Sequence, residues 1–356
     1  MTMESKLRHF AKQLTQESRN AMVRLASPYQ PLRPTRLATV AVNMYPAFGS
    51  WGGSSAFVHQ LVAALRRCGF RAVFDLRRDV DVILMIDPRD DLQNKAFGLD
   101  DIKRYRVRHP CVKIIHRINE CDQRKNTAFM DDLLRAANAV ADYTVFISEW
   151  LKEYFIARWF DPARAHTVIY NGADPSVFHP VGGTKWEPAK GALRLVTHHW
   201  SPNPMKGFPV YKMLDDMIVD GQLRDTELWV IGQWPANVHW RAARAFSPAA
   251  GHRLASMLRR CHVYVTASLW EPCGMHHVEG AQCGLPLFYH EKGGGIVEAG
   301  GRYGIGFRED NIFSSLEILR RDYKKLRRRV FDYMPDGTRM AIEYIRVVQR
   351  ILAGEA

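Results

Sequence analysis

Short apolar runs alternate with helix-like segments along most of this chain, and the alternation occurs twice. In the first series, apolar runs of strand type lie at residues 37–42, 72–74, 80–86, 112–115 and 144–147. In the second series, they lie at residues 193–196, 228–231, 263–265 and 285–289. Strands that alternate with helices form a parallel sheet with helices on both faces. The sequence therefore predicts an α/β fold with two such sheets.

A segment rich in Gly, Lys and Pro and poor in apolar side chains, residues 181–190, separates the two series and is the best linker candidate. The chain has 356 residues, whereas a single core stops growing at ~250 to 300 residues. We therefore predict a first domain and a second domain of the same architecture, with a further segment at each end. The predicted boundaries are 1–35, 36–182, 183–334 and 335–356.

The two end segments each carry a helical pattern. Residues 339–352 are apolar at helical spacing after a Pro-Asp-Gly break, which predicts a C-terminal helix. We expect this helix to pack across both domains and to cross back to the first. Near the N-terminus, Leu7, Phe10 and Leu14 form an amphipathic stripe among basic residues. This stripe either docks on the protein's own surface or lies in a membrane interface.

Charge and composition exclude some classes of protein. The chain has 50 basic and 37 acidic residues, a net charge of +13, which favours phosphorylated ligands, polyanions or anionic lipid without choosing among them. The basic segment 320–329 is most simply a solvated helix face, with anionic lipid as the sharper reading. A nucleic-acid partner is not expected, because no recognised module or aromatic platform accompanies the charges.

The N-terminus, the apolar runs and the cysteines indicate the cellular compartment. The N-terminus lacks a secretory core, no run of ~18 apolar residues occurs, and the six cysteines show no paired spacing. We therefore expect reduced thiols and a cytoplasmic protein, with peripheral membrane contact left open.

The segment 268–286, SLWEPCGMHHVEGAQCGLP, is the densest signal for chemistry. Here a strand ends and a helix begins, so the backbone amides of Gly274 and Met275 stand at a helix N-terminus, where an anion such as a diphosphate binds. Glu271 and Glu279 are eight residues apart, so both carboxylates can border one cleft. Carboxylates repel phosphate, and these two are better suited to the hydroxyl groups of a sugar and a ribose.

This segment resembles glycosyltransferase family 4, and the resemblance extends over nearly all of residues 37–352. The positions that match the family motif are Glu271, Pro272, Gly274, Glu279, Gly284 and Pro286. Cys273 and Met275 differ in type but not in size class. The resemblance implies the GT-B fold, two Rossmann-like domains facing across a cleft, with the donor mainly on the second domain and the acceptor mainly on the first.

The resemblance also implies roles for single residues. Glu271 would be catalytic near the reacting centre, Glu279 would hold the ribose, and Cys273, Gly274 and Met275 would line the donor site. Lys206, which follows a strand of the second series, looks like the family's donor-phosphate lysine. The family has an arginine five or six residues earlier, where this chain has Ser201 and Trp200.

Because this arginine is missing, stabilisation of the diphosphate leaving group would come from Lys206 and the helix amides. His198 and His199 are candidate phosphate contacts. In the first domain, Gly52 and Gly53 resemble the family's Gly-Gly loop, which lets backbone approach the donor. His116 ends an apolar strand and matches a family histidine near the donor sugar. We assign it a catalytic role, with a structural polar residue at a strand end as the alternative.

The predicted activity is therefore retaining transfer of a sugar from a nucleotide diphosphate sugar to a hydroxyl acceptor, which could be a glycan, a lipid-linked molecule or a small molecule. No metal and no cofactor are expected, because Lys206 and helix amides can stabilise the leaving group and no Asp-x-Asp pair accompanies the phosphate site. Two alternatives stay open: a nucleotide-sugar epimerase of the same fold, and a non-catalytic nucleotide-sugar-binding or scaffold protein.

Overall fold

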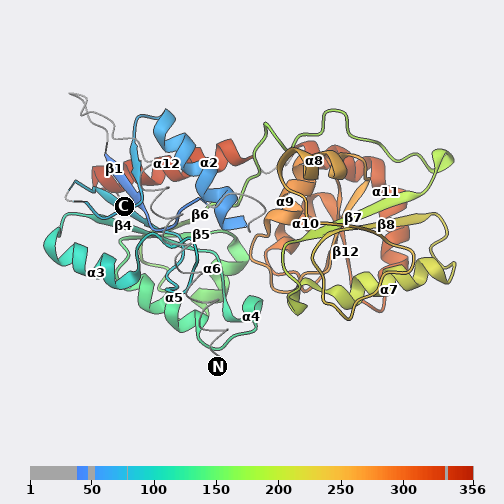
Figure 1. The fold of residues 1–356 in the computed structure, drawn as a ribbon, viewed down its shortest axis with the longest axis horizontal. Helices are drawn as coiled ribbons and strands as arrows, with labels where there is room; N and C mark the ends of the chain where they lie inside the picture. The colour runs from blue at the N-terminus through green and yellow to red at the C-terminus, as the bar shows by residue number, and fades with distance from the viewer. Residues whose placement is uncertain (1–37, 47–52, 78, 333–335, 356) are drawn as a thin grey trace, which may run out of the picture.

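The chain folds into two α/β domains that lie side by side (Figure 1). The computed structural model describes residues 38–46, 53–77, 79–332 and 336–355. The amphipathic stripe near the N-terminus and Gly52 lie outside these residues.

The first domain is built on a parallel sheet of six strands in the order β2-β1-β3-β4-β5-β6. The strands are β1 (Thr39–Val42), β2 (Arg71–Val73), β3 (Val82–Met85), β4 (Lys113–Ile118), β5 (Tyr143–Phe146) and β6 (His166–Val168). The helices that follow them are α2 (Gly53–Arg67), α3 (Leu99–Arg108), α4 (Asp122–Lys125), α5 (Met130–Asn138) and α6 (Glu149–Ile156).

Strand β3 shows why its sequence is apolar throughout. Successive side chains of a strand point to opposite faces of the sheet. Val82 and Leu84 pack in the cluster that contains α2, whereas Ile83 and Met85 pack in the cluster that contains α3. Because helices cover both faces, every position of the strand is buried.

The second domain repeats this plan with a parallel sheet in the order β12-β11-β10-β7-β8-β9. The strands are β7 (Leu193–His199), β8 (Thr226–Gly232), β9 (Arg244–Phe246), β10 (Val263–Thr266), β11 (Leu287–His290) and β12 (Gly304–Phe307). Helices α7 (Phe208–Val219) and α11 (Ile312–Asp332) pack on one face. Helices α8 (Gly251–Arg259), α9 (Met275–Gln282) and α10 (Ile296–Tyr303) pack on the other.

The C-terminal helix α12 (Gly337–Ala353) returns to the first domain, as the sequence predicts. Met340, Tyr344 and Ile351 join the cluster formed by α2 and the first sheet, and Figure 1 shows α12 against α2, away from the second domain. Asp336 caps the helix by accepting a hydrogen bond from the amide of Thr338 at 2.7 Å. The chain therefore crosses between the domains twice.

Three strands were not expected from the sequence: β6, β9 and β12. Each lies at an edge of its sheet. Their side chains are mostly half-buried or exposed, so the apolar signal is weak, and β12 contains two glycines. An edge strand is held by backbone pairing to one neighbour, and a hydrophobic pattern does not record that pairing.

The order of the strands determines where a ligand can bind. In an open parallel sheet, ligands bind beyond the carboxyl ends of the strands, at the point where the strand order reverses. That point lies between β1 and β3 in the first domain and between β7 and β10 in the second.

Three further sequence predictions concern the basic segment 320–329, the cysteines and membrane-spanning helices. On α11, Lys324, Lys325 and Arg328 are exposed between buried positions, as expected of a solvated helix face. All six cysteines have free thiols, which agrees with the lack of paired spacing. Over the described ranges, no helix has the length and apolar character needed to cross a membrane.

Candidate functional site

A cleft of about 320 Å³ lies between the two domains and receives side chains from both. Its volume is in the range of small-molecule sites. Nine of the eleven residues that we predicted for the site line it: Gly53, His198, His199, Lys206, Glu271, Cys273, Gly274, Met275 and Glu279. Of the other two, Gly52 lies outside the described residues and His116 lies elsewhere.

The loop that carries Glu271 connects β10 to α9 and is held by its backbone. Trp270 has a φ of 53°, a left-handed conformation that is uncommon for a large side chain and is found at functional sites. The amide of Glu271 donates to the carbonyl of Gly293 at 3.1 Å. A Cβ on Gly294 would come within 3.0 Å of that amide nitrogen. The Gly293–Gly295 run is therefore the packing partner of the Glu271 loop as well as a turn.

Glu271 is buried, and two cations converge on one of its oxygens. Arg124 Nε donates to Glu271 Oε2 at 2.9 Å, and Lys206 Nζ donates to the same oxygen at 2.8 Å. Burial alone would raise the pKa of Glu271, but the charges of Arg124 and Lys206 outweigh it and hold this pKa well below its ordinary value. The carboxylate is therefore ionised at neutral pH.

Lys206 reaches the cleft from a short 3₁₀ turn, Pro204–Lys206, that follows β7. The side chain of Asn203 caps this turn by accepting from the amide of Met205 at 2.8 Å. Burial lowers the pKa of Lys206, and the carboxylate of Glu271 opposes that shift. The lysine therefore has one bonded anion, which a phosphate could replace.

Helix α9 begins directly beside Glu271. Gly274 is its N-cap, and a Cβ there would come within 2.9 Å of Glu271 Cγ. The amides of the first turn of a helix have no acceptor within the helix, and the helix dipole places partial positive charge there. These amides, Lys206 and Glu271 therefore border the same part of the cleft.

Glu279 lies one helical turn further along α9 and is held by a histidine. His198 Nε2 lies 2.8 Å from Glu279 Oε2, and His198 Nδ1 lies 3.1 Å from the hydroxyl of Tyr264. The ring is thereby fixed at both nitrogens. The carboxylate of Glu279, held by this ring, is therefore positioned to accept hydrogen bonds from adjacent hydroxyl groups of a ligand.

His199 lines the same wall but is bonded inward. Its Nε2 lies 2.9 Å from the hydroxyl of Tyr211 and 3.0 Å from that of Thr197. Burial, with the charge of Lys206 adding to it, holds the pKa of His199 well below its ordinary value. The ring is therefore neutral, and any phosphate contact by His199 would be a hydrogen bond rather than a charge pair.

The first domain contributes Gly53 and a set of polar side chains that the sequence analysis missed. A Cβ on Gly53 would come within 2.5 Å of Met275 Cγ, so glycine lets α2 approach the second domain. The polar side chains that were missed include Asp87, Arg89, Arg117, Asn119, Glu120 and Arg124. Four of them follow His116 closely along the chain, and this polar stretch beyond an apolar strand was a signal for the same sheet edge.

His116 is placed differently from our expectation. Its side chain is fully buried and does not line the cleft, and its Nδ1 lies 3.2 Å from the side chain of Asn138. Burial lowers the pKa of His116 to about 3, so the ring is neutral. Because alternate side chains of β4 face opposite sides of the sheet, His116 points toward α5, and Arg117 points toward α2 and lines the cleft.

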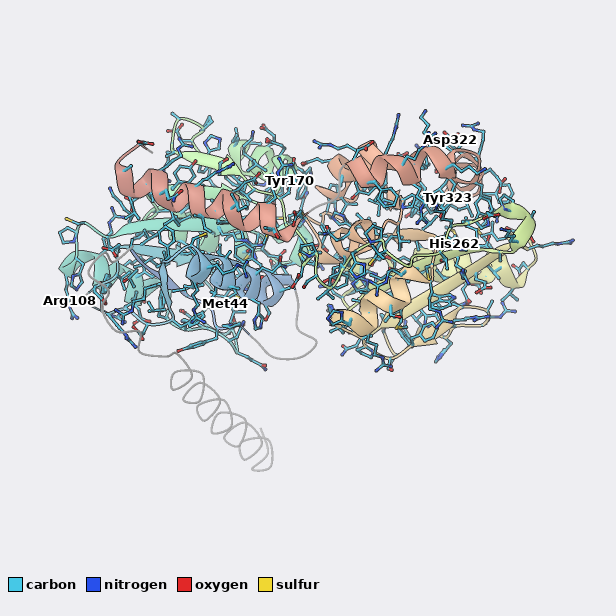
Figure 2. All side chains as sticks on the ribbon, turned by 90° about the horizontal axis from the view of Figure 1, so that it is seen from above. Met44, Arg108, Tyr170, His262, Asp322 and Tyr323 are labelled. Atoms are coloured by element: carbon cyan, nitrogen blue, oxygen red, sulfur yellow. The ribbon has the colours of Figure 1, made fainter. Side chains whose placement is uncertain are left out.

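Direct contacts join the domains beside the cleft. The carboxylate of Glu298 on α10 accepts a hydrogen bond from Tyr170 Oη at 2.6 Å and bonds to the first amides of α6. Figure 2 shows Tyr170 on the side of the first domain that faces the second. Asn171 Nδ2 donates to the carbonyl of Cys273 at 2.7 Å. These contacts fix the loop of Cys273 against the first domain.

No protein-family model and no curated protein match this sequence. Solved structures are similar over most of the chain. Sucrose-phosphate synthase from Thermosynechococcus elongatus is 14% identical, with a TM-score of 0.62, over 90% of this chain and 100% of that one. Anabaena HepE in complex with UDP and glucose is 13% identical, with a TM-score of 0.61, over 87% and 99% of the two chains.

WaaG, a glycosyltransferase involved in lipopolysaccharide biosynthesis, is 13% identical, with a TM-score of 0.55, over 86% and 94%. A Listeria monocytogenes protein with the proposed activity of a UDP-N-acetylglucosamine 2-epimerase is also 13% identical, with a TM-score of 0.53, over 90% and 98%. At these identities the likeness establishes the fold. The chain therefore has the GT-B fold, the two-domain α/β architecture of these glycosyltransferases.

Proposed function

We propose that this chain is a glycosyltransferase that moves a sugar from a nucleotide diphosphate donor to a hydroxyl acceptor, with retention at the anomeric carbon. The observation that carries the proposal is the cleft that joins the start of α9 with Lys206, Glu271 and Glu279. Each part suits one portion of such a donor. The helix amides and Lys206 suit the diphosphate, Glu271 suits the sugar, and Glu279 suits the ribose.

The chemistry follows from these contacts. As the bond between the sugar and the diphosphate breaks, negative charge grows on the diphosphate, and the helix amides and Lys206 stabilise that charge. The ionised Glu271 stands beside them and can accept hydrogen bonds from the sugar while positive charge develops at the anomeric carbon. The structural relatives crystallised with UDP or with UDP-glucose support a uridine nucleotide as the first donor to test.

The proposal is tested by ligand stabilisation and then by turnover. A thermal-shift panel of nucleotide diphosphates and their sugars should contain at least one stabilising ligand, because a ligand at 100 times its dissociation constant adds ~2.7 kcal/mol to the free energy of unfolding. The matching sugar nucleotide should then release its diphosphate when a hydroxyl acceptor is added. Failure of every nucleotide to bind would contradict the proposal.

The same assay separates the alternatives. An epimerase would convert the sugar nucleotide without an acceptor, and a scaffold protein would bind the nucleotide without turnover on any acceptor. Metal independence, which is part of this proposal, requires that the rate survives exhaustive chelation. A rate that vanished with chelator and returned with Mn²⁺ would overturn that part.

The class of acceptor depends on the N-terminal segment. If its amphipathic stripe lies in a membrane interface, each basic residue near an anionic surface adds ~1 kcal/mol of binding. Deletion of residues 1–27 should then weaken binding to anionic liposomes, most strongly at low salt, which favours a lipid-linked acceptor. Equal binding of the full-length and truncated chains would favour a soluble acceptor.

A further inference from the structure

Arg124 and Lys206 come from different domains and meet on one carboxylate oxygen. Arg124 lies on α4 of the first domain, and Lys206 follows β7 of the second. Their nitrogens lie 2.9 Å and 2.8 Å from Glu271 Oε2, and all three side chains line the cleft. Two cationic donors around one anionic oxygen are the surroundings that suit an oxygen of a phosphate group, because phosphates accept such charge-assisted hydrogen bonds.

The charges around this oxygen do not balance. Arg124 and Lys206 face Glu271, and the nearby Glu120 also attracts both cations but pairs with Lys125 at 2.9 Å, so three cations stand against two carboxylates. Arg124 Nη1 is buried without a hydrogen-bond partner among the described residues. A buried donor without a partner is costly, so this arrangement favours a ligand that brings further acceptors. A diphosphate would supply both the missing charge and the missing oxygens.

The turn that carries Arg124 is held in place by an acid of its own domain. The carboxylate of Asp122 accepts from the amides of Met130 and Asp131 at 2.8 Å and 3.1 Å. It also accepts from the hydroxyl of Thr127 at 2.6 Å. Arg124 is thus presented on a fixed turn and is not a mobile surface side chain.

We infer that Arg124, from the first domain, supplies the second cation of the diphosphate site. The second domain has Trp200 and Ser201 at the positions where the family has an arginine. This inference rests on the proposed function. In the present arrangement Glu271 occupies the position between the two cations, and the diphosphate would take that position while Glu271 turns to the sugar. The site is then complete only when the two domains are in contact.

Isothermal titration with a nucleoside and its diphosphate tests this inference. Arg124→Met should weaken diphosphate binding about ten- to a hundredfold and leave nucleoside binding within about twofold, because only the diphosphate reaches the cation. Arg124→Lys, which keeps the charge without the fork of donors, should lose less. Arg106→Met is the matched control, since Arg106 pairs with Asp142 within the first domain and lies outside the cleft.

A structural clamp would give a different result. If Arg124 only held the domains together, Arg124→Met would weaken the nucleoside and the diphosphate alike, and that outcome would overturn the inference. Diphosphate affinity within about twofold of the parent for both Arg124 variants would also overturn it. Thermal unfolding establishes that each variant is folded. If the parent chain bound no nucleotide diphosphate at all, the proposed function itself would fail, which separates the two failures.

Discussion

The two walls of the cleft differ in how they are held. In the second domain, Glu279, His198 and Tyr264 bond to one another within their own domain, so that wall is built before any ligand arrives. In the first domain, Arg124 finds its anion across the cleft, on Glu271. Arg117 bonds to Asn171 but has buried Nε and Nη1 atoms without partners among the described residues. The second-domain wall is thus held within its own domain, whereas the first domain presents one cation, Arg124, whose anion lies across the cleft.

The largest effect should follow from loss of the charge at which the two walls meet. We expect Glu271→Gln to lower kcat by ~10²-fold or more, because a preorganised charge at a reacting centre contributes on this scale. Initial rates of diphosphate release with acceptor measure this. Glu291→Gln is the matched control, since Glu291 is exposed and pairs with Arg308 outside the cleft. A Glu271→Gln rate within about threefold of the parent would contradict the central role of this carboxylate.

Glu279 tests whether the preformed wall binds the nucleoside portion. Glu279→Ala should weaken binding by ~1 to 3 kcal/mol as hydroxyl contacts are lost. Because the ribose is common to both ligands, the nucleoside and its diphosphate should lose affinity by a similar factor in calorimetry. This differs from Arg124→Met, which should affect only the diphosphate. Unchanged affinity would remove the ribose role from Glu279.

A substitution at His116 tests whether this residue is a buried structural residue outside the first-domain wall of the cleft. Because its side chain is buried and bonded to Asn138, His116→Ala should lower the free energy of unfolding by ~1 to 3 kcal/mol. The value of kcat/KM should stay within about threefold of the parent. Denaturant unfolding and initial rates measure the two effects. A variant with parental stability but a rate at least tenfold lower would restore the catalytic role that the sequence suggested.

The smallest effect concerns acid stability. The folded-state pKa of Glu271 is depressed, so its contribution to stability is present above its ordinary pKa of 4.5 and is lost as the pH falls toward the folded value. Removing this group by Glu271→Gln should make the free energy of unfolding less dependent on pH below about 4.5, by at most ~1.4 kcal/mol per pH unit. Unfolding curves collected between pH 5 and about pH 3 measure the slope. An unchanged slope would mean that Glu271 titrates normally.

The second-domain half of the site was predictable because its parts are adjacent in the sequence. A strand, a loop with Glu271 and a helix that starts at Gly274 occur in one short segment, and a helix N-terminus positions its own amides. Lys206 was predictable for a similar reason, since it follows the end of a strand. The first-domain half was less predictable. The strand that ends near His116 was identified, but which of two adjacent side chains faced the cleft was not.

The sequence by itself determined the fold class, the two parallel sheets and the presence of a C-terminal helix, because apolar spacing records which faces of strands and helices are buried. The edge strands, the burial of His116 and the meeting of Arg124 with Lys206 were decided by the tertiary structure. Arg124 and Glu271 are 147 positions apart, and only the packing of two domains brings them within a hydrogen bond. A local sequence pattern does not record the contact between Arg124 and Glu271, because that contact depends on how the whole interface between the domains packs.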